Sequence, residues 1–128
     1  MRLIMESWRR YLYDPAEAVN EALIELGAKE EGTFLNGPPP IKSVALSTQN
    51  DTIWIHWIEG ERPGAGAWKY LSKIISQVAP NTPIALEANF EAAPFWEKQG
   101  FEEIDQQEAE EIYPNIEVDN RFFLKDYP

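Results

Sequence analysis

Apolar residues near the start of the chain recur at the spacing of one helical face. Asp14-Pro15-Ala16-Glu17 precedes them and combines a capping aspartate, a proline suited to the first helical position and a glutamate that can complete a capping box. Gly27 follows them and is typical of a helix end. The pattern predicts a helix over 14–26, preceded by an arginine-rich helix over 3–13. The apolar stripe of the second helix consists of Val19, Ala22, Leu23 and Leu26.

The middle of the chain predicts a β-hairpin. Residues 41–48 alternate between apolar and small polar side chains, Gln49-Asn50-Asp51 suits a turn, and 52–58 would be the antiparallel partner. Both faces of 52–58 are apolar or aromatic, so we expect this strand to be central and buried. The loop Asn36-Gly37-Pro38-Pro39-Pro40 would end any strand that comes before it.

A crossover should follow this hairpin. An apolar face runs from Trp68 to Val78 at helical spacing, Pro80-Asn81 stops it, and 83–89 has the composition of a strand. Strand, helix and strand in succession give a right-handed crossover, so the strands 53–58 and 84–88 should be parallel. Beyond it we expect a short helix over 92–99, a strand from Phe101, a helical turn or two within the acidic 105–118, and a last strand over 121–125.

Composition limits the range of functions. A chain of 128 residues suits one domain spanning 1–128. It has no cysteine and one histidine, which argues against a zinc or other metal centre. The net charge of −11 argues against nucleic acid or an anionic membrane as a partner. No apolar run is long enough to span a bilayer, and the first residues lack the apolar core of a signal peptide, so we expect a soluble cytoplasmic protein.

The glycine-rich turn around Gly64 and Gly66 is the strongest functional feature. It lies between a predicted strand and a predicted helix, where glycines let the backbone approach a ligand and the first amides of the helix have no internal partner. Such a turn suits a phosphate group. Arg62, Lys69 and Lys73 form a basic island beside it, which fits either a polyanionic cofactor or an ordinary solvated helix face.

Two elements together resemble the GCN5-related N-acetyltransferase (GNAT) family over roughly 41–104. They are the glycine turn and a later element with Asn89, Ala92, Phe95, Gly100 and Phe101. The resemblance implies a mixed, mostly antiparallel α/β sheet with a parallel splayed strand pair and helices on both faces. It also implies that 1–28 lies on the acceptor side, that 41–104 binds acyl-coenzyme A, and that 105–128 forms an acidic segment and the last strand.

The resemblance further implies a site for acetyl-coenzyme A as co-substrate. The backbone after the glycine turn would hold the pyrophosphate, and the pantetheine would pair with the end of the preceding strand. Two departures from the family are Glu61, where Arg or Gln is usual, and Trp96, where Tyr is usual. The positions that correspond to the cofactor site are Trp57, Ile58, Glu59, Arg62, Gly64, Ala65, Gly66, Ala67, Asn89 and Trp96.

Amide formation needs a base for the amine and support for the leaving thiolate. His56 is the first candidate base, with Glu59 and Glu87 as alternatives, although a histidine between tryptophans is more often a packed residue. An indole cannot supply the proton that a matching Tyr would give. We therefore expect an N-acetyltransferase acting on a primary amine of a small molecule or peptide. The alternative is a non-catalytic GNAT-like binding protein.

Two further observations concern the first residues and the type of glycine turn. The first ten residues resemble the opening of some marine bacteriophage proteins. A nucleotide-binding domain is disfavoured, because the turn lacks the Lys-Ser/Thr of a P-loop and the third glycine of a dinucleotide fingerprint. The sequence leaves a homodimer open.

Overall fold

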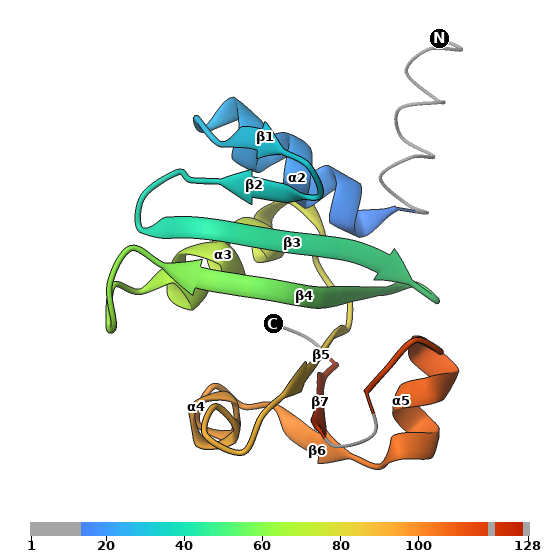
Figure 1. Cartoon of the computed structure of the whole chain (residues 1–128). Coiled ribbons are helices and arrows are strands. Elements are labelled where there is room, and N and C mark those ends of the chain that lie inside the picture. The colour runs from blue at the N-terminus through green and yellow to red at the C-terminus, as the bar shows by residue number, and fades with distance from the viewer. Residues whose placement is uncertain (1–13, 118–119, 127–128) are drawn as a thin grey trace, which may run out of the picture.

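The computed structural model describes residues 14–117 and 120–126; the predicted helix over 3–13 and the phage-like opening lie outside these ranges. The described part is a seven-stranded sheet with helices packed on it (Figure 1). The strand order is β1-β2-β3-β4-β5-β7-β6. The elements are α2 (Pro15–Glu25), β1 (Lys29–Glu31), β2 (Phe34–Asn36), β3 (Ile41–Gln49), β4 (Thr52–Gly60), α3 (Ala67–Val78), β5 (Ile84–Ala88), α4 (Ala93–Lys98), β6 (Glu102–Ile104), α5 (Gln106–Ile112) and β7 (Arg121–Lys125).

The helix α2 begins as the sequence predicts. The Asp14 carboxylate accepts a hydrogen bond from the backbone amide of Glu17 at 3.1 Å and another from the Thr48 hydroxyl at 2.6 Å, which ties the helix start to the end of β3. The predicted stripe is wrong at Leu26, which is 50% exposed. The helix ends at Glu25, and Gly27, at φ +115°, turns the chain away before Leu26 can reach the core.

The hairpin and the crossover are both confirmed. β3 and β4 are antiparallel and joined through Asn50 and Asp51, whose positive φ angles suit a tight two-residue turn. β4 and β5 are parallel, and every other neighbouring pair in the sheet is antiparallel. The predicted mixed, mostly antiparallel sheet is therefore correct.

The expectation that β4 is buried throughout is wrong. Residues 52–55 are buried, whereas Trp57 is 48% exposed. The reason is that β4 pairs with β5 only from Ile53 to Ile55. Beyond Ile55 the two parallel strands diverge, so the end of β4 has a strand neighbour on one side only.

The helices lie on both faces of the sheet, as expected. α2 and α3 pack together against one face and cover the main core, which includes Val19, Leu71 and Ile75 (Figure 1). Val78, the last residue of the predicted α3 face, is 37% exposed because it lies at the helix end. α5 packs against β7 on the opposite face, where Trp54 is buried.

The short strands β1 and β2 are not among the predicted elements. Each has three residues, and Lys29-Glu30-Glu31 of β1 is charged and exposed throughout, so no alternation marks it. The elements α4, β6, α5 and β7 occur where the sequence predicts them. Within the described residues no helix combines the length and the apolar character that crossing a membrane requires.

Candidate functional site

The glycine turn after β4 presents unpaired backbone amides. Gly64 and Gly66 have φ angles of +77° and +87°, and Gly66 caps α3 without any side-chain hydrogen bond. The turn is closed by a bond from the Ala65 amide to the Arg62 carbonyl at 3.1 Å. Within the described residues the amides of Gly66, Ala67, Trp68 and Lys69 have no hydrogen-bond acceptor. These donors stand at the positive end of α3, which is the arrangement of an anion site.

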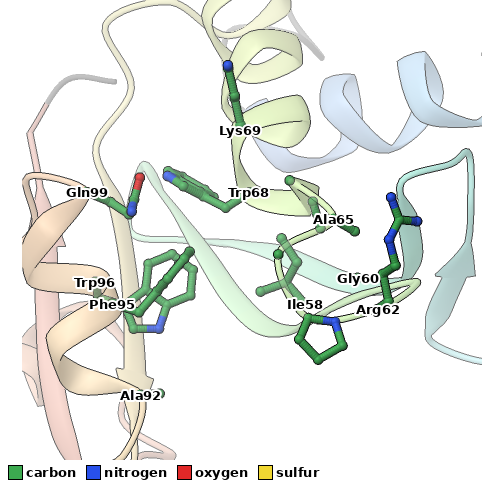
Figure 2. Close-up of a pocket in the computed structure, with 14 residues that line it drawn as sticks. Ile58, Gly60, Arg62, Ala65, Trp68, Lys69, Ala92, Phe95, Trp96 and Gln99 are labelled. Carbon is green, nitrogen blue, oxygen red and sulfur yellow. The ribbon is translucent and has the colours of Figure 1, made fainter.

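A pocket of about 510 Å³ opens beside this turn, between the end of β4, the start of α3 and the helix α4 (Figure 2). This volume is within the range of small-molecule sites. Of the positions predicted to bind a cofactor, the pocket is lined by Ile58, Arg62, Gly64, Ala65, Gly66, Ala67 and Trp96. The pocket is also lined by Lys69 of the basic island, by Ala92 and Phe95 of the later motif, and by four residues to which the sequence assigned no role: Gly60, Pro63, Trp68 and Gln99.

Three predicted cofactor positions do not line the pocket. Asn89 instead closes the turn that leads into α4, because its side-chain oxygen accepts a hydrogen bond from the Ala92 amide at 2.8 Å. The Trp57 indole donates to the Ser43 hydroxyl at 2.9 Å, and Glu59 pairs with Lys42 at 3.5 Å. Trp57 and Glu59 therefore point to the other face of the sheet.

Trp96 is part of an aromatic cluster under the pocket. Its ring lies 5.4 Å from Trp68, 5.3 Å from Phe101 and 5.0 Å from Phe95, in each case close to edge-to-face. Trp96 is only 7% exposed. Phe90, although close in sequence, is 72% exposed and lies against Arg121. The cluster fixes α4 against α3.

The side chains of the basic island are exposed. Within the described residues Arg62, Lys69 and Lys73 form no ion pair. Figure 2 shows Arg62 extending from the side of the turn that faces away from α4, and Lys69 pointing away from Trp96. Neither cation is directed into the pocket in this structure.

The strand β4 contains a bulge at His56. Ala45 pairs with Trp57 and Leu46 pairs with Ile55, so His56 is an extra residue opposite this stretch of β3. The bulge begins where β4 leaves β5. It also turns His56 and Trp57 to the same face as Ser43 and Ser47 of β3.

His56 contacts two groups on this face. Its Nε2 is 2.5 Å from the Ser47 hydroxyl, and its ring is edge-to-face with Tyr113 at 5.3 Å. Partial burial lowers the pKa of His56 below its usual 6.5, while the negative charge of Glu87 opposes this and raises the pKa. At neutral pH the imidazole is therefore uncharged, as a base must be before it accepts a proton.

The two alternative bases have different surroundings. The Glu87 carboxylate accepts hydrogen bonds from the backbone amide of Glu117 at 3.2 Å and from the Asn120 side chain at 3.1 Å. Glu59 accepts the Ser43 hydroxyl at 3.4 Å in addition to its pairing with Lys42. Both carboxylates share the face of His56, and both are already engaged.

Tyr113 and Ser47 are the residues of this face that the sequence reasoning missed. Tyr113 follows α5 at a position far from His56 in the chain, and no motif marks it. Among the described residues no group of three or more His, Cys, Asp or Glu side chains is arranged to hold a metal ion.

The sequence matches no known family model, and it has no significant match among curated proteins. The structure is similar to the crystal structure of an acetyltransferase of the GNAT family from Staphylococcus aureus Mu50. The two have a TM-score of 0.54 and 17% sequence identity, and the match covers 86% of this chain and 74% of the other. The chain therefore has the fold of that GNAT acetyltransferase.

Proposed function

We propose that this protein is an N-acetyltransferase that transfers the acetyl group of acetyl-coenzyme A to a primary amine of a small molecule or peptide. The observation that carries the proposal is the set of four unpaired amides at the start of α3, opening on a pocket beside diverging parallel strands in an acetyltransferase fold.

The donor would bind with its pyrophosphate on these amides. Backbone donors at a helix start hold phosphate oxygens without desolvating a charged side chain. Arg62 and Lys69 lie beside the turn and can reach toward the remaining phosphate charge. The pantetheine would then run past Ile58, whose side chain lines the pocket, toward the gap between β4 and β5.

The acceptor would approach from the face that carries His56. There the imidazole is uncharged at neutral pH and can take a proton from an ammonium group, which frees the nitrogen lone pair. The amine nitrogen then attacks the thioester carbonyl, the C–N bond forms, the C–S bond breaks with release of the thiolate, and the nitrogen gives up its second proton to water. The acceptor and the donor thus meet at the point where β4 bulges and leaves β5.

In the described part of the chain, the pocket offers the leaving thiolate no matching acid. Within the described residues no hydroxyl, thiol, carboxyl or imidazole group lines the pocket, and Trp96 can donate a hydrogen bond but not a proton. We infer that the thiolate takes its proton from water. The same observation favours a second candidate function, a non-catalytic domain that binds acyl-coenzyme A.

Calorimetric titration with acetyl-coenzyme A tests the donor site, and release of free coenzyme A over an amine panel tests catalysis. Because the protein contains no cysteine, a thiol reagent reacts with released coenzyme A and not with the protein. Binding with turnover supports the enzyme, and binding without turnover supports the non-catalytic domain. Failure to bind acetyl-coenzyme A refutes both.

A further inference from the structure

The connection that follows α5 lies against the strand that carries His56. Tyr113 caps the end of α5 through a bond from its backbone amide to the Ala109 carbonyl at 2.8 Å. Its ring packs on two residues of β4, Trp54 at 5.0 Å and His56 at 5.3 Å. One aromatic side chain therefore spans the last paired part of β4 and the bulge.

This connection is tied to the sheet on both sides of Tyr113. Before it, the Asn50 side chain of the β3–β4 turn donates to the Glu111 carbonyl at 3.2 Å. After it, Glu117 and Asn120 donate to the Glu87 carboxylate on β5. A ring held in this way is a rigid support for a neighbour, since side chains that lock each other's rotamers keep a site in its productive geometry.

The bulge makes such a support necessary. A bulged residue is left out of the regular strand pairing, so the backbone alone constrains its side chain less. The His56 ring has the Ser47 hydroxyl at Nε2 and the Tyr113 ring against its side. Within the described residues its Nδ1 has no hydrogen-bond partner.

We propose that Tyr113 is a positioning residue of the catalytic site: together with Ser47 it holds the His56 imidazole so that Nδ1 is the nitrogen that takes the proton of the acceptor amine. This inference rests on the proposed acetyltransferase function. It is built on the contacts: Ser47 occupies Nε2, and Nδ1 is the base if Nε2 is the nitrogen that carries the hydrogen.

The proposal fixes the hydrogen positions. The neutral imidazole carries its hydrogen on Nε2 and donates it to the Ser47 oxygen, which also accepts the Gln49 side-chain amide at 3.0 Å. The ammonium group of the acceptor gives one proton to Nδ1, which leaves a neutral amine and an imidazolium ion. The imidazolium returns this proton to water after the amide has formed.

The single histidine makes this tautomer directly measurable. A long-range proton–nitrogen NMR spectrum of the wild-type protein at pH 8 shows one imidazole. We expect Nε2 to carry the hydrogen and Nδ1 to be bare. A spectrum with the hydrogen on Nδ1 overturns the proposal, and this measurement needs neither a variant nor activity.

Variants test the role of the ring. Tyr113→Ala removes the ring that packs against His56, so the pKa of His56 should rise toward the usual value and kcat should fall about 10- to 100-fold, while acetyl-coenzyme A affinity is kept. Tyr113→Phe keeps the ring and should behave as the wild type does. Phe34→Ala is the matched control, because Phe34 is an exposed aromatic on the same face that contacts Trp57 rather than His56.

Serine variants test the other support. Ser47→Ala should alter the NMR signals of the imidazole and lower kcat, whereas Ser43→Ala, which loses contacts with Trp57 and Glu59 but none with His56, should leave the NMR signals unchanged. Wild-type turnover combined with an unaffected kcat in Tyr113→Ala refutes the positioning role and leaves the proposed function intact. Absence of acetyl-coenzyme A binding in the wild type refutes the proposed function and this inference with it.

Discussion

Substitution of Gly66 by valine tests the amide cradle most directly. Gly66 has φ +87° and ψ +26°, a left-handed conformation that disfavours a side chain. A Cβ atom built there meets no atom within 4 Å, so the cost to the fold is conformational and not steric. For a branched residue in this region the cost is about 1–3 kcal/mol of the free energy of unfolding. We expect Gly66→Val to fold with a lowered melting temperature.

The loss of binding follows from the same open space. In the proposed complex a phosphate oxygen occupies the volume beside Gly66 that the valine side chain would fill. Losing one charge-assisted bond from a backbone amide costs about 1.5–3 kcal/mol of binding free energy. That corresponds to a dissociation constant for acetyl-coenzyme A raised about 10- to 150-fold.

Gly32→Val is the matched control for this experiment. Gly32 lies in the turn between β1 and β2, has φ +62° and also leaves a Cβ atom without a neighbour within 4 Å. The two variants should lose similar stability in thermal unfolding followed by circular dichroism. Calorimetric titration should show weakened binding only for Gly66→Val. Equal affinities in the two folded variants would show that the cradle does not hold the donor.

Three further predictions concern the pocket and the base. Replacing both Arg62 and Lys69 by alanine should weaken acetyl-coenzyme A binding about 2- to 30-fold and flatten its dependence on salt; identical titrations at low ionic strength would exclude the basic island from the site. Trp96→Tyr should lower the melting temperature or the affinity without raising kcat, because the indole packs against Phe101 and its neighbours; a several-fold faster turnover would show instead that a phenol is needed for the thiolate. The pKa of His56 is lowered in the folded state, so the unfolded chain binds a proton on His56 first as the pH falls. The contribution of neutral His56 to the free energy of unfolding is therefore complete above the usual pKa of 6.5 and is lost as the pH falls through the folded pKa. The rate should follow the same ionisation, and an NMR titration that places this pKa at or above 6.5 would contradict the reasoning.

Much of the fold can be derived from the sequence because local rules dictate it. Asp14 caps α2 because a carboxylate just before a helix accepts a hydrogen bond from an amide of the first turn, whatever the rest of the fold. Asn50 and Asp51 make a tight turn because both tolerate positive φ. The crossover through α3 makes β4 and β5 parallel because a strand–helix–strand unit has one preferred hand. The glycine turn can also be predicted from local rules, because its proposed role in binding phosphate needs only the backbone conformation that glycine permits.

Local rules do not predict the short strands β1 and β2. β1 and β2 have too few residues for an alternation to show, and they exist because Leu35 can be buried beside Val44 of β3. Asn89 matches the family motif in sequence, yet its side chain serves the helix start of α4. A motif identifies residue types, whereas the hydrogen-bond partner is decided in space.

The face on which a side chain acts was decided only by the tertiary structure. Strict alternation would put His56 and Trp57 on opposite faces of β4, but the bulge turns both toward Ser43 and Ser47. Tyr113 reaches His56 from the end of α5, although no spacing in the chain relates them. The amide cradle could therefore be predicted because it is a local property of backbone and glycine. The environment of the base could not, because packing between distant elements creates it.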